Sequence, residues 1–184
     1  MLALGTGAPA FSLPDAVSGK TVTLDTFAPG KGLLVMFLCP HCPYVKHVQR
    51  VLANLLNGYA GSALGIVAIS SNDVAQYPED SPEGLRAQAA ELGFAFPYCY
   101  DESQTAATAY RAACTPDFFL FDAGRKLVYR GQMDSSRPKN DIPVTGGDLR
   151  AAIDAVLAGS AVSAEQRPSI GCNIKWKPGH DPGY

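Results

Sequence analysis

The stretch that decides the fold is residues 33–43, Leu33-Leu34-Val35-Met36-Phe37-Leu38-Cys39-Pro40-His41-Cys42-Pro43. Its first five residues are all apolar, which is typical of a strand buried on both faces of a parallel sheet. Residues 44–56, which follow, carry apolar side chains at helical spacing, and Asn57-Gly58 supplies a stop. The two cysteines therefore lie where a central strand ends and a helix begins.

The rest of the chain alternates between strand and helix patterns, with a β-hairpin expected near the N-terminus. The elements that we expect are a hairpin over 8–15 and 21–24, a strand over 64–69, a helix over 82–92, a short strand over 96–100, a short helix over 103–113, paired strands over 118–121 and 126–130, and a last helix over 146–157. Right-handed crossovers make the first strands parallel. The paired strands over 118–121 and 126–130 add an antiparallel part. The pattern therefore predicts an α/β fold with a central mixed sheet flanked by helices.

Length and composition favour one domain. With 47% hydrophobic residues in 184, the chain can bury a sizeable core, and we expect a domain over 1–160. The tail over 161–184 contains Ile170, Ile174 and Trp176, which is too apolar for a free linker, so we expect it to pack on the same domain. No internal repeat or low-complexity segment interrupts this organisation.

Charge and hydropathy limit the partners and the cellular compartment that we expect. A net charge of −2, without a basic block, gives no sign of a nucleic-acid partner or an anionic membrane surface. The N-terminus has neither the basic region nor the apolar run of a secretory signal, and no stretch approaches the roughly 20 apolar residues that span a bilayer. We therefore expect a cytoplasmic protein.

Five cysteines are an odd number, and a core of this size does not need disulfide staples. In a reducing compartment, a close Cys-x-x-Cys pair is more often catalytic or metal-binding than structural. Cys99, beside aromatic residues in the expected strand over 96–100, is interpreted as a small buried hydrophobe.

Helix-capping rules suggest how the close pair works. Pro43 suits the first helical position, where an N–H would lack an intrahelical partner, and this makes Cys42 the N-cap. Free amides and the helix dipole can lower a cysteine pKa from about 8.5 to roughly 3.5–7.5, and the thiolate is the nucleophile. We therefore expect Cys42 to attack and Cys39 to resolve the intermediate.

A competing frame obeys the same rules: Cys39 caps the helix, Pro40 occupies the first helical position, and Cys42 resolves. Only Leu38 would then separate the strand from the cap, which is a short connection for the turn, so we prefer Cys42 as nucleophile.

Two other interpretations of this segment stay open. Cys39, His41, Cys42 and His47 offer thiolate and imidazole ligands for zinc or copper, but no second Cys/His pair follows at a zinc-finger spacing, and we expect no metal and no cofactor. His41 either tunes the thiolate through its charge or is an exposed loop histidine without a role.

Several motifs resemble the thioredoxin-like superfamily, on its peroxiredoxin and AhpC/TSA side. They are Phe11-Ser12-Leu13-Pro14-Asp15, the Cys-x-x-Cys junction and Thr115-Pro116-Asp117-Phe118-Phe119-Leu120-Phe121. A narrower resemblance, to a redoxin group labelled thiol-disulfide isomerase or thioredoxin, is carried by residues 39–46, Tyr77-Pro78-Glu79-Asp80 and Ile170-Gly171-Cys172-Asn173-Ile174-Lys175-Trp176.

The resemblance implies a thioredoxin fold and a thiol–disulfide oxidoreductase, with weak antioxidant peroxidase activity. It places Cys42 where peroxiredoxins keep their peroxidatic cysteine, and it implies that Thr115-Pro116 is a cis peptide bond packed against the active cysteines. Cys39 replaces the threonine that peroxiredoxins use to bind peroxide, so efficient peroxide reduction is in doubt. Cys114 and Cys172 are candidate accessory thiols.

The partners that the resemblance implies are a disulfide-containing protein or small hydroperoxide as substrate, and a thioredoxin-type reductant or low-molecular-weight thiol as electron donor. Two alternatives to the enzyme remain: a copper- or zinc-handling module of thioredoxin fold, and a thioredoxin-like binding domain without catalysis.

Overall fold

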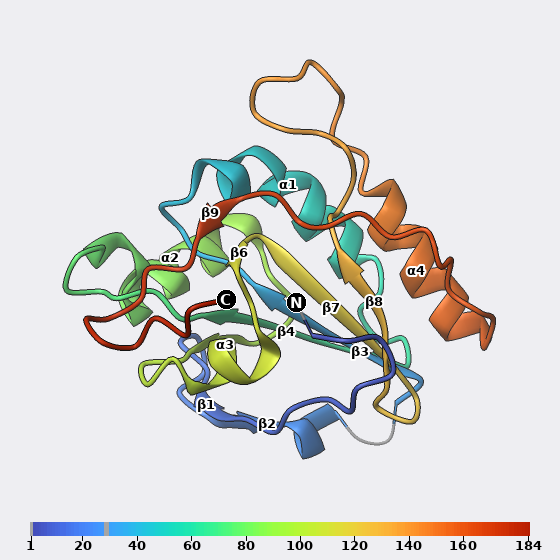
Figure 1. Cartoon of the computed structure of the whole chain (residues 1–184), viewed down its shortest axis with the longest axis horizontal. Helices are drawn as coiled ribbons and strands as arrows, with labels where there is room; N and C mark the ends of the chain where they lie inside the picture. The colour runs from blue at the N-terminus through green and yellow to red at the C-terminus, as the bar shows by residue number, and fades with distance from the viewer. Residues whose placement is uncertain (1, 28–29) are drawn as a thin grey trace.

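Strand β3 (Gly32–Phe37) lies at the centre of a five-stranded sheet with the order β5-β4-β3-β7-β8 (Figure 1). The computed structural model describes residues 2–27 and 30–184. Strand β3 runs parallel to β4 (Leu64–Ser70) and antiparallel to β7 (Asp117–Asp122). The sheet is completed by β5 (Tyr98–Tyr100), parallel to β4, and β8 (Leu127–Gly131), antiparallel to β7. This is the mixed sheet that the sequence predicts.

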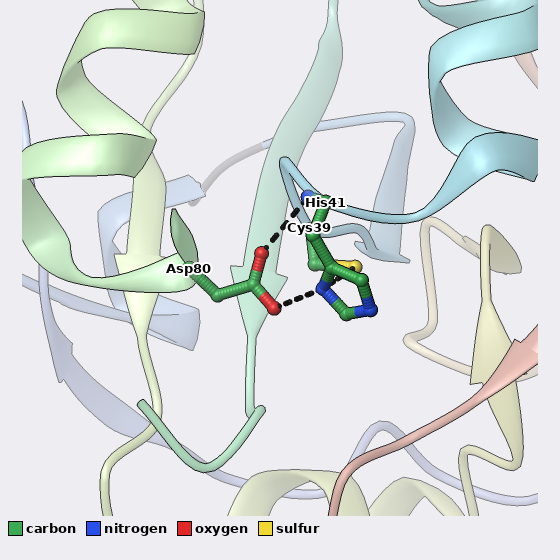
Figure 2. Close-up of side chains that lie close together, drawn as sticks. All are labelled: Cys39, His41 and Asp80. Carbon is green, nitrogen blue, oxygen red and sulfur yellow. Dashed lines mark hydrogen bonds and ion pairs between the residues drawn. The ribbon is translucent and has the colours of Figure 1, made fainter. Parts of the chain in front are cut away.

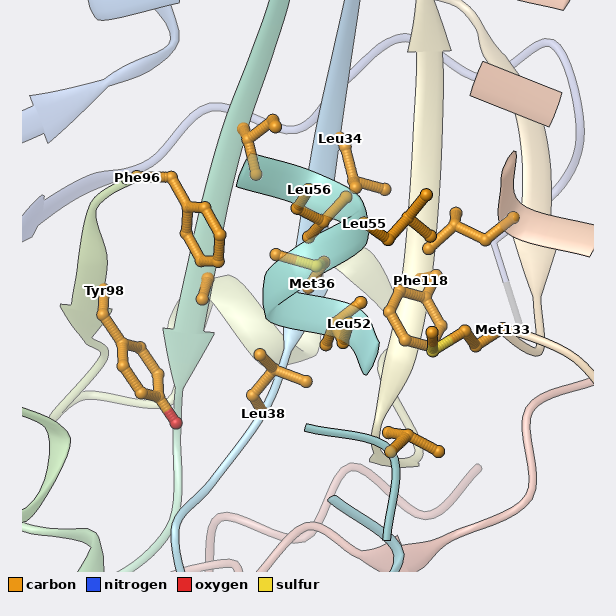
Figure 3. Close-up of a cluster of buried hydrophobic side chains, with 14 of the residues drawn as sticks. Leu34, Met36, Leu38, Leu52, Leu55, Leu56, Phe96, Tyr98, Phe118 and Met133 are labelled. Carbon is orange, nitrogen blue, oxygen red and sulfur yellow. The ribbon is translucent and has the colours of Figure 1, made fainter. Parts of the chain in front are cut away.

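The side chains of β3 divide between two cores because successive residues of a strand point to opposite faces. Leu34 and Met36 lie in the core that Figure 3 shows, whereas Leu33, Val35 and Phe37 lie in the other. Every residue of β3 is buried. A strand covered on both faces needs a continuous apolar run, which is why this segment contains no polar residue.

Helices α1 (Pro43–Asn57), α2 (Pro82–Leu92) and α4 (Gly147–Ala158) contribute apolar side chains to the first core. Helix α3 (Thr105–Tyr110) and the hairpin of β1 (Ser12–Pro14) and β2 (Thr21–Thr23) contribute to the second. Two short 3₁₀ helices complete these layers, η1 (Leu24–Phe27) and η2 (Pro78–Asp80). Along the described parts of the chain, no helix combines the length and apolarity that crossing a membrane requires.

The C-terminal tail crosses the carboxyl end of β3 and pairs with the loop before β7. Its strand β9 (Cys172–Asn173) is antiparallel to β6 (Cys114–Thr115), and the two strands lie side by side in Figure 1. Ile174 is buried and Trp176 packs against the second core, but Ile170 is exposed. Of the three apolar tail residues, Ile170 is therefore the one that does not pack on the domain.

Two predicted elements are shorter than expected, and each has a local reason. The strand expected over 96–100 begins at Tyr98, because Pro97 has no N–H to donate to the sheet. The helix expected over 103–113 is only Thr105–Tyr110, because Arg111 adopts a left-handed conformation with φ 51° that ends it.

Candidate active site

The two cysteines lie between the end of β3 and the start of α1. Helix α1 begins at Pro43, and Cys42 is its N-cap, with φ −65° and ψ 122°. The frame in which Cys39 caps the helix is therefore wrong. The Leu38 amide still donates to the Ile69 carbonyl at 3.0 Å, so strand pairing continues almost to Cys39. Both cysteines have 0% of their surface exposed.

The surroundings of Cys42 lower its pKa to about 4. The largest cause is a hydrogen bond from Cys39; burial opposes it, and Thr115, the Val45 amide and Cys172 lower the pKa further. The Cys42 Sγ also lies 3.2 Å from the Thr115 carbonyl, a contact that favours the thiol because only a thiol can donate there. The donors to sulfur outnumber this one acceptor, so the thiolate is the favoured form.

The expected source of this stabilisation is only partly right. Sγ of Cys42 makes no capping hydrogen bond of normal geometry, and Pro43 at the first helical position has no N–H to offer. The backbone contribution comes from the Val45 amide and is smaller than that of the Cys39 thiol. The neighbouring thiol, rather than the helix start alone, therefore carries most of the effect.

The pKa of Cys39 shifts in the opposite direction. Its pKa is raised strongly, first by the hydrogen bond it donates to Cys42, then by burial and by the negative charge of Asp80. Its Sγ lies 3.3 Å from Thr115 Oγ1 and 3.7 Å from His41 Nδ1. The pair therefore holds one proton, and that proton resides on Cys39.

His41 is bound to the buried carboxylate of Asp80, a residue to which the sequence motifs assign no role. Its Nδ1 lies 2.5 Å from Asp80 Oδ2, and its backbone N–H donates to Asp80 Oδ1 at 3.0 Å (Figure 2). The ring also stacks on Tyr77, with centroids 4.6 Å apart. The alternative of an exposed loop histidine is therefore wrong, since the His41 side chain is only 14% exposed.

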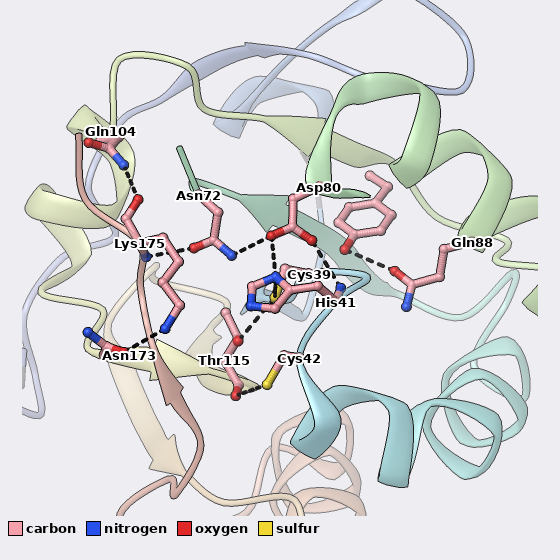
Figure 4. Close-up of polar contacts among 11 residues, drawn as sticks. Cys39, His41, Cys42, Asn72, Asp80, Gln88, Gln104, Thr115, Asn173 and Lys175 are labelled. Atoms are coloured by element: carbon pink, nitrogen blue, oxygen red, sulfur yellow. Dashed lines mark hydrogen bonds and ion pairs between the residues drawn. The ribbon is translucent and has the colours of Figure 1, made fainter. Parts of the chain in front are cut away.

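A chain of hydrogen bonds connects this carboxylate to the tail (Figure 4). Asn72 Nδ2 donates to Asp80 Oδ2 at 2.8 Å, and Asn72 Oδ1 accepts from the Lys175 amide at 2.9 Å. The Lys175 carbonyl accepts from the Asp73 amide and from Gln104 Nε2. Asn72 thus binds both the tail and the carboxylate that pairs with His41.

The Thr115-Pro116 bond is cis, which confirms what the resemblance implies. Thr115 meets both cysteines, its hydroxyl at Cys39 and its carbonyl at Cys42. Cys172 lies opposite Thr115 in the β6–β9 pairing and is partly exposed. Burial first, and then Cys42, raise the pKa of Cys172 to about 11.

Burial governs the ionisation of the two remaining cysteines. Cys114 is buried, and burial raises its pKa strongly, so it is a protonated thiol near the site. Cys99 is fully buried in the second core, where burial raises its pKa to about 12. Its interpretation as a small buried hydrophobe is confirmed.

The cluster proposed for metal binding does not form as predicted. His47 Nε2 instead lies 2.7 Å from Ser136 Oγ. The atoms that could hold a cation are the Cys39 sulfur, the His41 Nδ1 and an Asp80 oxygen, which lie within 4.8 Å of one another. His41 and Asp80 already use these atoms to bind each other, so we interpret the group as a proton-handling network.

The mixed sheet and the pair of thiols at a helix start beside a cis-proline define a thioredoxin-fold redox protein. The chain belongs to the AhpC/TSA family, which matches residues 4–130. This membership makes it an oxidoreductase of thioredoxin type in general terms. No curated protein matches the chain.

Solved structures agree with this fold. A hypothetical protein of Sinorhizobium meliloti 1021 is 51% identical over 97% of each chain, with a TM-score of 0.95. An uncharacterised protein of Geobacillus kaustophilus is 54% identical over 97% of this chain and 94% of that one, with a TM-score of 0.94. The thioredoxin domain of a thiol-disulfide oxidoreductase of Bacteroides vulgatus is 22% identical over 71% of this chain and 89% of that one, with a TM-score of 0.59, and supports the fold alone.

Proposed function

We propose that the chain is a thiol–disulfide oxidoreductase in which Cys42 is the nucleophile and Cys39 resolves the intermediate. The observation that carries the proposal is the opposite shift of two adjacent thiols, with the pKa of Cys42 lowered to about 4 and that of Cys39 raised strongly. At neutral pH one sulfur is ready to attack, and the other keeps its proton until an intermediate forms.

The reaction proceeds by two exchanges. The Cys42 thiolate attacks one sulfur of a substrate disulfide, forms a mixed disulfide and releases the first substrate thiolate. Cys39 then loses its proton and attacks the Cys42 sulfur, which forms the Cys39–Cys42 disulfide and releases the second substrate thiolate. Two electrons pass from the pair to the substrate.

The His41–Asp80 pair is the proposed acceptor of the Cys39 proton. The Cys39 Sγ lies 3.7 Å from His41 Nδ1, which shares a hydrogen with Asp80 Oδ2. The Nδ1 lone pair is free for the thiol proton only after the shared hydrogen has moved to the carboxylate, so the pair takes up one proton and the Asp80 carboxylate is neutralised. Asp80 is fully buried, so its carboxylate has no contact with solvent.

A small hydroperoxide is a second, weaker substrate in this proposal. Attack by Cys42 on the peroxide would release an alcohol and leave a sulfenic acid, which Cys39 would convert to the disulfide with loss of water. The Thr115 hydroxyl contacts Cys39 rather than Cys42, so it is poorly placed to bind a peroxide at the nucleophile. We expect disulfides to be the better substrates.

The proposed partners are a disulfide-containing protein as substrate and a thioredoxin-type reductant or low-molecular-weight thiol as electron donor. An odd set of five cysteines suits a reducing compartment, and we place the enzyme in the cytoplasm.

The test compares single cysteine variants in a protein-disulfide reduction assay. Cys42→Ser should abolish turnover. The double variant Cys39→Ser/Cys172→Ser, which has no thiol left beside Cys42 to resolve the intermediate, should stop after one exchange and retain substrate as a mixed disulfide at Cys42. Cys99→Ser, in the other core, serves as the control and should retain activity. Turnover by Cys42→Ser at the wild-type rate would refute the proposal.

Metal handling is a second candidate, favoured only by the closeness of Cys39, His41 and Asp80. Stoichiometric zinc or copper in protein purified without added metal, lost in Asp80→Asn, would favour it over the enzyme. A non-catalytic binding domain would instead show ordinary thiol titration at both Cys39 and Cys42.

A further inference from the structure

The proposed active cysteines are shielded from solvent. Cys39 and Cys42 both have 0% of their surface exposed, although thiol–disulfide exchange requires an attacking sulfur to reach the bond directly. While the tail is docked, a small thiol from solution therefore meets Cys172 before either of these two sulfurs. Cys172 is partly exposed and lies at this point.

The pairing of β9 with β6 places Cys172 near Cys42. Strand β9 pairs with β6 so that Cys172 lies opposite Thr115, whose carbonyl is 3.2 Å from the Cys42 sulfur. The two thiols also affect each other's ionisation, because Cys172 helps to lower the pKa of Cys42 and Cys42 raises that of Cys172. The site therefore contains three sulfurs in sequence, ordered from buried to exposed.

Gly171 makes this arrangement possible. A Cβ at this position would lie 2.0 Å from the Thr115 carbonyl oxygen, so only glycine lets the tail approach the Thr115-Pro116 bond. Lys175, further along the tail, is held by Asn72, which also holds Asp80. Contacts before and after Cys172 in the tail, at Gly171 and Lys175, thus hold it near the Thr115-Pro116 bond.

Building on the proposed function, we infer that Cys172 is a third redox-active thiol, through which low-molecular-weight thiols in solution reduce the buried Cys39–Cys42 disulfide. The external thiol attacks at the exposed sulfur, and internal exchange passes the electrons inward. Cys172 thereby becomes a catalytic residue of the reductive half-reaction.

The internal step is an exchange without any outside reagent. The Cys172 thiolate attacks the Cys42 sulfur of the Cys39–Cys42 disulfide, the Cys42–Cys172 bond forms, and Cys39 leaves. Cys39 takes up the proton that Cys172 has lost, by way of His41 and Asp80. One disulfide replaces another, and the number of protons is unchanged.

The external step then opens the new disulfide from outside. A thiolate RS⁻ attacks the Cys172 sulfur, Cys42 leaves as a thiolate, and a Cys172–S–S–R mixed disulfide remains. A second RS⁻ attacks the R sulfur, which yields RSSR and the Cys172 thiolate. In total, two RS⁻ and one proton convert the Cys39–Cys42 disulfide to one thiol, one thiolate and RSSR.

The charges of the site favour the external step. A leaving thiol of low pKa leaves faster, and Cys42, with a pKa of about 4, is the leaving group when an external thiolate opens the Cys42–Cys172 disulfide. In the oxidised protein Cys42 carries no charge, so its contribution to the high pKa of Cys172 disappears and the attacking thiolate forms more readily. Cys39, whose pKa is raised strongly, is a suitable final holder of the proton.

The experiment follows reduction of the oxidised protein by glutathione in wild type, Cys172→Ala and the control Cys99→Ala. Samples are quenched in acid, alkylated and mapped by mass spectrometry. Cys172→Ala should slow reduction about tenfold or more. Cys172→Ser keeps a hydrogen-bond donor but no sulfur, and it should slow reduction by a similar factor, because the inferred role needs the sulfur itself. A wild-type rate in Cys172→Ala would overturn the inference.

A trapping variant gives a second, independent readout. Cys39→Ser treated with one equivalent of oxidised glutathione should accumulate the Cys42–Cys172 disulfide. A stable mixed disulfide of Cys42 with glutathione would overturn the inference. Failure of the proposed function would look different: wild-type protein would form no Cys39–Cys42 disulfide, and Cys42→Ser would keep full turnover.

Discussion

Cys172 lies directly opposite Thr115 in the antiparallel pairing of β9 with β6. Thr115 in turn contacts Cys39 through its hydroxyl, at 3.3 Å, and Cys42 through its carbonyl, at 3.2 Å. Thr115, the residue that precedes the cis-proline, therefore lies against three cysteines from two distant parts of the chain. Because these contacts depend on backbone position, small displacements of the tail should change the chemistry of the buried pair.

Gly171→Ala tests whether the tail shields the site. The added Cβ would lie 2.0 Å from the Thr115 carbonyl oxygen, so β9 must move away. We expect alkylation of Cys39 and Cys42 to accelerate about tenfold or more, since local opening controls access to buried groups. Timed alkylation with mass spectrometry measures the effect. The control is Gly147→Ala at the start of α4, where the nearest atom is 3.5 Å away, and an equal acceleration there would show that tail contact is irrelevant.

Asp80→Asn tests proton transfer from Cys39. The amide still accepts from the His41 backbone N–H, but it cannot take up a proton as the carboxylate does. We expect turnover to fall about a hundredfold, which is typical for loss of a general base. Asp73→Asn is the matched control, because the Asp73 side chain binds only the nearby Ala75 amide and Gln76. Unchanged turnover in Asp80→Asn would remove Asp80 from the mechanism.

Asp117 introduces a pH dependence of stability. It is 1% exposed, its Oδ1 has no hydrogen-bond partner among the described residues, and burial raises its pKa to about 6 from 3.8. Between these values the native state keeps a proton that the unfolded chain has lost, so this group destabilises the fold as pH rises.

We therefore expect Asp117→Asn to gain roughly 2 kcal/mol in free energy of unfolding, relative to wild type, between about pH 4 and about pH 7.5. Urea unfolding at both pH values measures this difference. Asp141→Asn, at an exposed position, should show no such gain. A free-energy difference between Asp117→Asn and wild type that does not change with pH would contradict the assignment.

Much of the fold could be predicted because its long elements carry periodic patterns. The strand expected over 33–37 is observed as Gly32–Phe37, and the helix expected over 44–56 as Pro43–Asn57. Capping rules, together with the short connection through Leu38, indicated that Cys42 rather than Cys39 begins the helix. The pairing of β6 with β9 could not be predicted, since two-residue strands have no periodicity.

The partner of His41 was missed for a related reason. Asp80 lies in a three-residue 3₁₀ helix and meets His41 across 39 positions, a contact that no local pattern encodes. The one available signal was Tyr77-Pro78-Glu79-Asp80, which the resemblance singled out without giving Asp80 a role. Gly84 offers a structural explanation for its position, because a Cβ there would collide with the Glu79 carbonyl and push η2 away from α2.

The most direct test of the account is the titration of Cys42 in the reduced protein. Thiolate absorbance in the ultraviolet is recorded from about pH 3 to about pH 9 for wild type and Cys42→Ser, and the difference reports the Cys42 sulfur alone. The account predicts a midpoint near pH 4, where the Cys39 thiol holds the charge on Cys42. A midpoint near the ordinary cysteine value of about 8.5 would contradict it, because no activated nucleophile would then exist.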